Sequence, residues 1–203
     1  MALLVSCGSV TSRPEHSGRL RAAKLVVPCQ QGEFDGFCGL YSVINALQLA
    51  LATTRPLSPR QCETLFKHGI AYLHKQQNLS AAARFGLRPR LWGWLADDVT
   101  AKAARLSRRL ITVQRPLAAV ETVTFSTLLD AIEAAVDCQK PVLLLLRGHL
   151  KHFTVVIGYS RSRLMLFDSY ALRWIAIASS DVSHGGCLAR HQIHARSLMV
   201  LSS

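Results

Sequence analysis

The second half of the chain contains a series of short apolar segments, and this series constrains the fold more than any other feature of the sequence. Five segments have the length and the content of aliphatic and aromatic residues that are typical of strands: residues 141–147, 152–159, 163–167, 173–178 and 197–201. The turns between the second, third and fourth segments are short and polar, as in hairpins. The sequence therefore predicts an antiparallel sheet in the C-terminal half.

The first half shows helical periodicity instead. After Cys38, apolar residues recur at the spacing of one helix face: they are Leu40, Val43, Ile44 and Leu47. Three further helices are expected: residues 59–76, 91–109 and 124–137. The first of these has a start signal in Ser58 as the N-cap and Pro59 in the first turn. Helices followed by a sheet predict the α+β fold class.

Three shorter segments are less regular. Residues 24–28 and 110–114 are candidate strands, and residues 78–90, which contain Gly86 and Pro89, are ambiguous. Half of the 203 residues are hydrophobic, which suits one well-filled core rather than two. Residues 1–22 mix Ser, Gly, Pro and Arg without apolar periodicity and are expected to form a flexible N-terminal arm. Residues 23–203 are then expected to form a single domain.

The chain is strongly basic, with a formal net charge of +12 at pH 7. This charge favours an acidic protein partner or a nucleic acid on electrostatic grounds. No nucleic-acid-binding module and no phosphate-binding glycine loop occurs in the sequence, so a nucleic-acid partner has no motif to support it. The longest apolar run, residues 141–146, has the length of a strand, and no membrane partner is expected.

The six cysteines do not have the spacing of a disulfide framework or of a zinc ribbon. They stand at positions 7, 29, 38, 62, 138 and 187, without a CxxC pair. Free thiols in a reducing compartment are therefore expected. Because no signal peptide or transmembrane segment is recognised, a cytoplasmic location is expected, with a secreted effector as the alternative.

Cys38 is the candidate nucleophile. It follows a glycine-containing loop and stands at the N-terminus of the first predicted helix. There the unpaired backbone N–H groups and the positive end of the helix dipole favour a thiolate, which is the reactive form of cysteine near neutral pH.

A thiol nucleophile needs a histidine base, and the histidine needs a partner that orients it. His152 begins the second predicted strand, and Asp168 follows the end of the third. If this hairpin pairs symmetrically about residue 160, the two residues lie directly opposite each other on one face, where a carboxylate can hold an imidazole. His149, in the preceding loop, is the competing base.

The oxyanion formed by attack on a carbonyl also needs hydrogen-bond donors. The backbone N–H of Cys38 is one donor. The side-chain amide of Gln31 or that of Gln30 is the second, because both residues precede the cysteine in a loop that contains Gly32 and Gly36.

These residues resemble the papain-like cysteine peptidases, whose chain order is Gln, then Cys on a helix, then His and Asp on successive strands. The resemblance is strongest to the short bacterial branch that includes the bacteriocin-leader (double-glycine) peptidase domains. It is carried by three stretches: Phe37-Cys38-Gly39-Leu40, His152-Phe153-Thr154-Val155-Val156 and Phe167-Asp168-Ser169. It implies a papain-like fold with the nucleophile helix packed on the antiparallel sheet.

The same resemblance implies a role for each residue. Cys38 would be the nucleophile, His152 the general base, Asp168 its orienting partner and Gln31 the amide of the oxyanion hole. Two features depart from the family pattern: the glutamine lies slightly further from the cysteine, and Asp168 is followed by Ser169 rather than by proline. No transporter segment is attached, so leader processing coupled to export is not implied.

A metal site is a weaker alternative near the C-terminus. Four potential ligands lie close together: His184, Cys187, His191 and His194. Their spacing suits no common tetrahedral zinc pattern, and the segment around Gly185 reads as a loop. We expect incidental loop histidines here, with no metal and no cofactor.

The sequence thus predicts a cysteine peptidase that hydrolyses peptide or isopeptide bonds of a protein or peptide substrate through a Cys38 thioester. Two alternatives stay open. The same triad could serve a glutamine deamidase or an acyltransferase, or the papain-like scaffold could be a non-catalytic module that binds an acidic partner through its positive charge.

Overall fold

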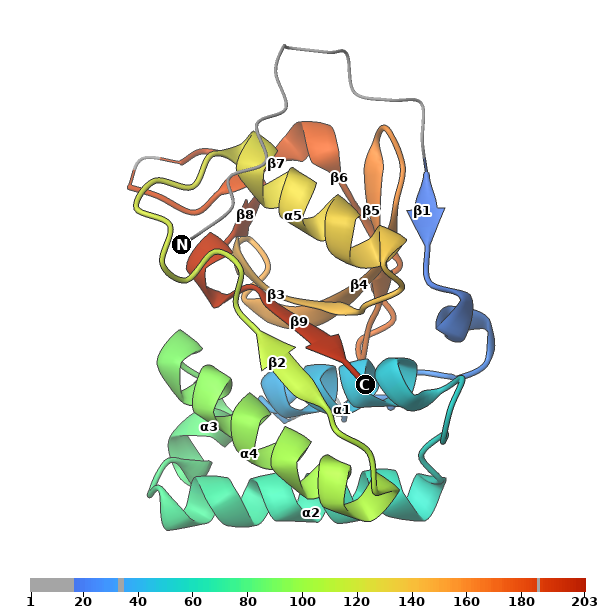
Figure 1. The fold of residues 1–203 in the computed structure, drawn as a ribbon. Helices are drawn as coiled ribbons and strands as arrows, with labels where there is room; N and C mark the ends of the chain where they lie inside the picture. Colours follow the sequence, from blue (N-terminus) through green and yellow to red (C-terminus); the bar gives the residue numbers. More distant parts are fainter. Residues whose placement is uncertain (1–16, 33–34, 186) are drawn as a thin grey trace.

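The computed structural model describes residues 17–32, 35–185 and 187–203. This part of the chain has a mixed α+β architecture, and its nine strands join in one sheet. Figure 1 shows one layer of helices against one face of the sheet and a single helix, α5, against the other. The α+β prediction is confirmed.

Five α-helices lie in the described part of the chain: α1 (Cys38–Leu51), α2 (Pro59–Lys75), α3 (Leu79–Phe85), α4 (Pro89–Ser107) and α5 (Phe125–Asp137). The strands are β1 (Gly18–Arg19), β2 (Thr112–Gln114), β3 (Val142–Gly148), β4 (His152–Tyr159), β5 (Arg163–Phe167), β6 (Trp174–Ala176), β7 (Ser180–Val182), β8 (His191–Ile193) and β9 (Met199–Ser202). Short 3₁₀ helices are η1 (Arg21–Lys24), η2 (Ile177–Ser179) and η3 (Ala195–Ser197).

The main path of the sheet runs β2, β9, β3, β4, β5, β6, and every neighbouring pair on this path is antiparallel. β1 pairs with the end of β4, and β8 pairs with β3 and, in parallel, with β7. The antiparallel sheet predicted for the C-terminal half is therefore present, with β2 and β1 added from earlier in the chain.

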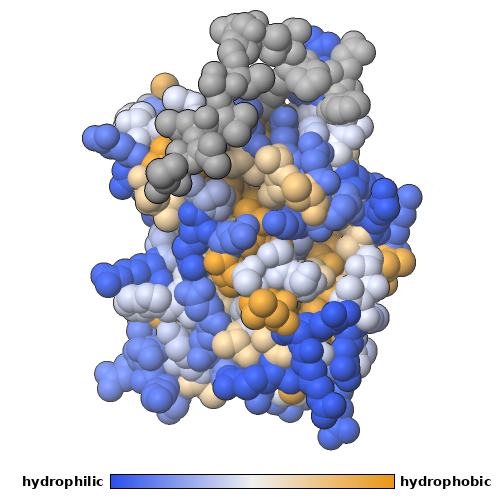
Figure 2. Space-filling view, in the orientation of Figure 1, coloured by the Kyte–Doolittle hydropathy of each residue, from blue (hydrophilic) through white to orange (hydrophobic). Residues whose placement is uncertain are grey.

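The strands β3 and β4 form the centre of the core. Both contact α1 on one side and α5 on the other. Burial on both faces explains the continuous apolar run Val142–Leu146, where alternation of apolar and polar residues would be expected for a half-exposed strand. Figure 2 shows that hydrophilic side chains cover much of the rim of the viewed face, around an apolar area near its middle.

α1 is the central helix of the layer that contains α1 to α4, and it packs against α2, α4 and the sheet. Most of its residues are buried, so it is apolar on nearly all sides rather than on one stripe. Its first residue, Cys38, is placed by this packing at one end of the core. The predicted start of α2 is confirmed, because Ser58 and Gln61 form a reciprocal capping box with Pro59 as the first helical residue.

Near the N-terminus, the structure corrects two predictions. Residues 24–28 form no strand: Arg21–Lys24 are a 3₁₀ helix, and the Leu25 and Val27 side chains are exposed. Residues 17–22, predicted to belong to the flexible arm, are packed on the domain, since Gly18 and Arg19 pair with β4 and Leu20 is buried. Residues 1–16 of the predicted arm lie outside the described residues.

Several predicted elements change length or identity. The ambiguous stretch 78–90 contains α3, and the predicted strands at 110–114, 173–178 and 197–201 are shorter or shifted as β2, β6 and β9. The loop expected around the C-terminal histidines contains two strands, β7 and β8. Among residues 17–32, 35–185 and 187–203, no helix combines the length and the apolar content needed to cross a membrane.

Candidate active site

Cys38 is the first residue of α1 and is buried, with 6% of its surface exposed. The preceding turn is held by Asp35, whose carboxylate accepts hydrogen bonds from the N–H groups of Gly32 at 2.9 Å and of Phe37 at 3.0 Å. Gly39 allows close packing behind the cysteine, because a Cβ there would lie 2.7 Å from the Leu87 side chain. The thiol is thus fixed at a helix N-terminus, as the sequence predicts.

The strands β4 and β5 bring His152 and Asp168 together, with 2.7 Å between His152 Nε2 and Asp168 Oδ2. The predicted symmetric register is wrong. Val155 pairs with Phe167, and a β-bulge between Val156 and Gly158 shifts the rest of the hairpin. Continuing the register at Val155 places Asp168 opposite Thr154, two residues from His152. A shift of two residues keeps both side chains on one face, because strand side chains alternate with a period of two.

The Asp168 carboxylate is fully buried and anchored at both oxygens. Its Oδ1 accepts hydrogen bonds from the N–H groups of Tyr170 at 2.8 Å and Leu172 at 3.3 Å, while Oδ2 faces His152. Burial alone would raise the pKa of Asp168, but the hydrogen bond and the positive charge of His152 outweigh it and lower the pKa. Asp168 is therefore ionised at neutral pH.

His152 is hydrogen-bonded to Asp168, and it lines the same cleft as Cys38. Since Nε2 contacts the carboxylate, Nδ1 is the ring nitrogen left for the thiol. Burial by itself would lower the pKa of His152, but the hydrogen bond and charge of Asp168, together with the neighbouring Cys38, raise it to about 9. The imidazole thus carries a proton at neutral pH and can pair with a thiolate, which would supply a nucleophile and a proton donor within one cleft.

Cys38 and His152 lie at a cleft of about 800 Å³, and Asp168 is buried behind His152. Cys38, Gln31 and His152 line the cleft, together with the β3–β4 turn, the turn after α3 and residues 170–172. A second hollow of about 290 Å³, between the end of α3 and β3, also reaches Cys38. The cysteine therefore borders two adjoining surface depressions, although it is itself buried.

Of the two candidate amides, Gln31 lines the cleft. Its backbone N–H donates to Ser169 O at 2.9 Å, and its Oε1 accepts from Ser169 Oγ at 3.4 Å. Its Nε2 donates to the backbone carbonyl of Asp35, which uses one of the two amide hydrogens and leaves the other for a ligand. Gln30 is exposed, donates to Pro28 O at 3.2 Å and does not line this cleft.

His149, the competing base, also lines the cleft from the β3–β4 turn. The buried carboxylate is bound by His152, however, so the structure joins His152 rather than His149 to the orienting group.

Two residues that organise the site, Asp35 and Ser169, were not among the predicted site residues. A local signal for Asp35 was present, because an Asp before Gly36 is typical of a turn that binds its own backbone. Ser169 has no such signal, because its contact with Gln31 joins residues 138 positions apart.

The four candidate metal ligands near the C-terminus do not form one cluster. His191 lies in β8, and burial lowers its pKa. Instead, ligand atoms of Asp181, His184 and Cys187 lie within 4.8 Å of one another. These three residues have the chemistry of metal ligands, but His184 is exposed, Asp181 is half-buried, and neither lines the Cys38 cleft.

Comparison of the chain with protein-family models, with curated proteins and with solved structures found no match.

Proposed function

We propose that the protein is a papain-like cysteine peptidase that hydrolyses peptide or isopeptide bonds through a Cys38 thioester. The observation that carries the proposal is that Cys38 and His152 line one cleft, that Cys38 influences the pKa of His152, and that His152 is hydrogen-bonded to the buried Asp168 carboxylate. A histidine–aspartate pair with a purely structural role would require neither a cysteine near the second ring nitrogen nor a cleft beside the histidine.

Each step of the reaction follows from this arrangement. The Cys38 thiolate attacks the substrate carbonyl, and the oxyanion accepts hydrogen bonds from the Cys38 N–H and from the free hydrogen of the Gln31 amide. Protonated His152 gives its proton to the leaving amine, which leaves a thioester on Cys38. Neutral His152 then takes a proton from water, which attacks the thioester, releases the acid product and regenerates the Cys38 thiolate beside protonated His152.

The cleft walls favour an extended protein or peptide substrate with acidic side chains. Arg84 and Lys151 line the cleft and supply positive charge. Phe85 and Tyr170 also line it, and both are more than half exposed, so they offer apolar contacts to a bound chain. The Arg84 guanidinium lies 5.3 Å from the centre of the Phe85 ring, which keeps charge and ring together at the rim.

The assignment is tested with a peptide probe that carries a thiol-directed electrophile. Wild-type protein is expected to be labelled at Cys38, and the Cys38→Ala and His152→Ala variants are expected to lose labelling by at least about 100-fold, because the nucleophile or its base is gone. The Cys138→Ala variant is the matched control, since Cys138 is an exposed thiol outside the cleft. Labelling of Cys38→Ala at the wild-type rate would overturn the proposal.

Mass spectrometry of candidate substrates then separates the reactions that a Cys38 thioester permits. Hydrolysis cuts the chain, whereas glutamine deamidation adds about 1 Da without a cut and acyl transfer adds the mass of the acceptor, since all three pass through the same covalent intermediate. Only a cut supports the peptidase assignment.

A further inference from the structure

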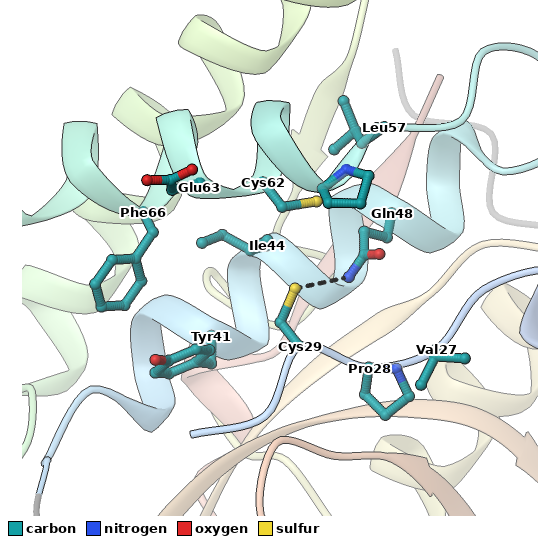
Figure 3. A pocket seen from close by; sticks show the side chains of 11 residues that line it. Val27, Pro28, Cys29, Tyr41, Ile44, Gln48, Leu57, Cys62, Glu63 and Phe66 are labelled. Atoms are coloured by element: carbon teal, nitrogen blue, oxygen red, sulfur yellow. Dashed lines mark hydrogen bonds between the residues drawn. The ribbon is translucent and has the colours of Figure 1, made fainter. Parts of the chain in front are cut away.

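A separate hollow, of about 370 Å³, lies between the segment 27–29, α1 and α2. Its walls are mainly apolar, with contributions from Val27, Ile44, Leu57 and Phe66. Figure 3 shows two cysteine side chains that enter this hollow from different elements, Cys29 from the segment before α1 and Cys62 from α2. Both are free thiols.

Cys29 is held in place by two buried polar side chains of α1. The Cys29 N–H donates to Asn45 Oδ1 at 2.7 Å, and the Cys29 carbonyl accepts from Asn45 Nδ2 at 3.3 Å. Gln48 Nε2 donates to the Cys29 sulfur at 3.2 Å, as the dashed line in Figure 3 marks. Asn45 and Gln48 are 0% and 7% exposed. Burial of polar groups is costly unless they form hydrogen bonds, and these two side chains form theirs with Cys29.

The Cys62 side chain, in the first turns of α2, enters the same hollow. The neighbouring Cys62 and the hydrogen bond from Gln48 outweigh burial and lower the pKa of Cys29 to about 7. The neighbouring Cys29 and burial raise the pKa of Cys62. The pair therefore combines a thiol that ionises near neutral pH with a neighbouring thiol that keeps its proton.

We propose that Cys29 and Cys62 are an oxidisable dithiol site that reacts with hydroperoxides and closes into a disulfide. The Cys29 thiolate attacks the outer oxygen of the peroxide, which breaks the O–O bond and leaves a sulfenic acid on Cys29 and water or an alcohol as product. The Cys62 sulfur, after loss of its proton, attacks the Cys29 sulfur and expels water. Two thiols are oxidised by two electrons, and the peroxide is reduced.

The structure supports each part of this step. The hollow gives a small oxidant access to Cys29, which is partly exposed, while Cys62 is buried behind it as the resolving thiol. Both side chains enter the same hollow, so the bond is expected to need only local movement. Disulfides in reducing compartments are typically transient or redox-sensing, and a dithiol reductant is expected to reverse this one. The site does not include Cys38, so the dithiol proposal can be tested independently of the peptidase proposal.

The test uses the full chain with Cys38→Ala, treated with about one equivalent of hydrogen peroxide and digested with trypsin without reduction. Trypsin places Cys29 in the peptide 25–60 and Cys62 in the peptide 61–67, because Arg55 is followed by proline. With Cys38 replaced, Cys29 is the sole cysteine of the first peptide. The two peptides are expected to appear linked, with a loss of about 2 Da relative to their summed masses, and to separate on reduction.

The exposed Cys138 of the same protein is the internal control. It is expected to be oxidised at least about tenfold more slowly than Cys29, which receives a hydrogen bond from Gln48 at its sulfur. Unlinked peptides 25–60 and 61–67 in a sample in which Cys138 is already oxidised would overturn the proposal.

Two conservative variants assign the roles. Cys62→Ser is expected to stop at the sulfenic acid of Cys29, which a dimedone-type reagent traps, whereas Cys29→Ser is expected to leave Cys62 reduced at the same peroxide dose. Gln48→Leu is expected to slow the oxidation of Cys29 at least about threefold, since it removes one donor to the thiolate. Trapping of Cys62 in the Cys29→Ser variant at the wild-type rate would contradict the assignment of Cys29 as the attacking thiol.

Discussion

The Asp168 carboxylate determines how His152 can act, because it occupies one ring nitrogen and leaves the other for Cys38. Its own geometry is fixed by the N–H groups of Tyr170 and Leu172. The imidazole is thereby held in one orientation. A solvated histidine would lose conformational entropy on adopting this orientation.

The pH dependence of the proposed activity follows from this pair. The active form has protonated His152, so activity is expected to decline as the pH rises through the pKa of His152 at about 9. Asp168→Asn removes the negative charge that raises this pKa, and the alkaline decline is expected to move to lower pH. The measurement is the pH profile of kcat/KM for both proteins. An identical alkaline limb in the variant would show that Asp168 does not set the protonation of His152.

Single residues also show the reach of sequence reasoning. The pairing of His152 with Asp168 could be predicted, because a hairpin brings together residues that are close in the chain. The choice between Gln31 and Gln30 could not, since it depends on the contact of Gln31 with Ser169 across 138 positions.

At the level of elements, α1 is the support of both sites. Its first residue is Cys38, while Asn45 and Gln48, two and three turns later, hold Cys29. Cys62 lies on α2, so α2 must pack closely on α1 for the two cysteines to share one hollow. Gly69 of α2 permits this packing, because a Cβ there would lie 2.4 Å from Leu40 Cδ1.

Replacement of Gly69 by alanine tests this contact. Alanine normally stabilises a helix interior, but Leu40 is completely buried and has no room to yield, so a net loss of about 1–2 kcal/mol in the free energy of unfolding is expected. Gly93→Ala in α4 is the matched control. Its added Cβ would meet no atom closer than 3.7 Å, so a gain of about 0.5–1 kcal/mol is expected. Urea unfolding measures both, and stabilisation of the Gly69 variant would contradict the tight packing of α1 on α2.

The elements that sequence reasoning got wrong share a physical cause. The register of β4 and β5 shifts at the bulge next to Gly158, where β1 pairs with β4, and the Gly18 carbonyl would lie only 2.8 Å from a Cβ at Gly158. That contact links residues 18 and 158, so no local pattern reports it. β7 and β8 escaped prediction because each has three residues, several of them polar, and their pairing depends on the sheet edge that they join.

For the whole molecule, the order of helices and strands was enough to predict the α+β class, because all five α-helices precede the strands β3 to β9 that form most of the sheet. The insertion of β9 between β2 and β3 was not predictable, since the last strand enters the sheet beside a much earlier one. The net charge of +12 is also a property of the whole chain, and it predicts a preference for acidic partners that no single motif indicates.

We expect Cys38→Ala protein to bind an acidic peptide more tightly than a neutral peptide of equal length. Because the attraction is electrostatic, its affinity is expected to fall at least about tenfold between roughly 50 and 200 mM salt. Fluorescence titration of labelled peptides measures this without turnover.

Arg84→Ala combined with Lys151→Ala separates the cleft from the general surface, since these two basic residues line the cleft. If binding uses the cleft, the double variant loses most of the preference for the acidic peptide. A preference that survives the double replacement, yet still falls with salt, would place acidic partners on the surface outside the cleft.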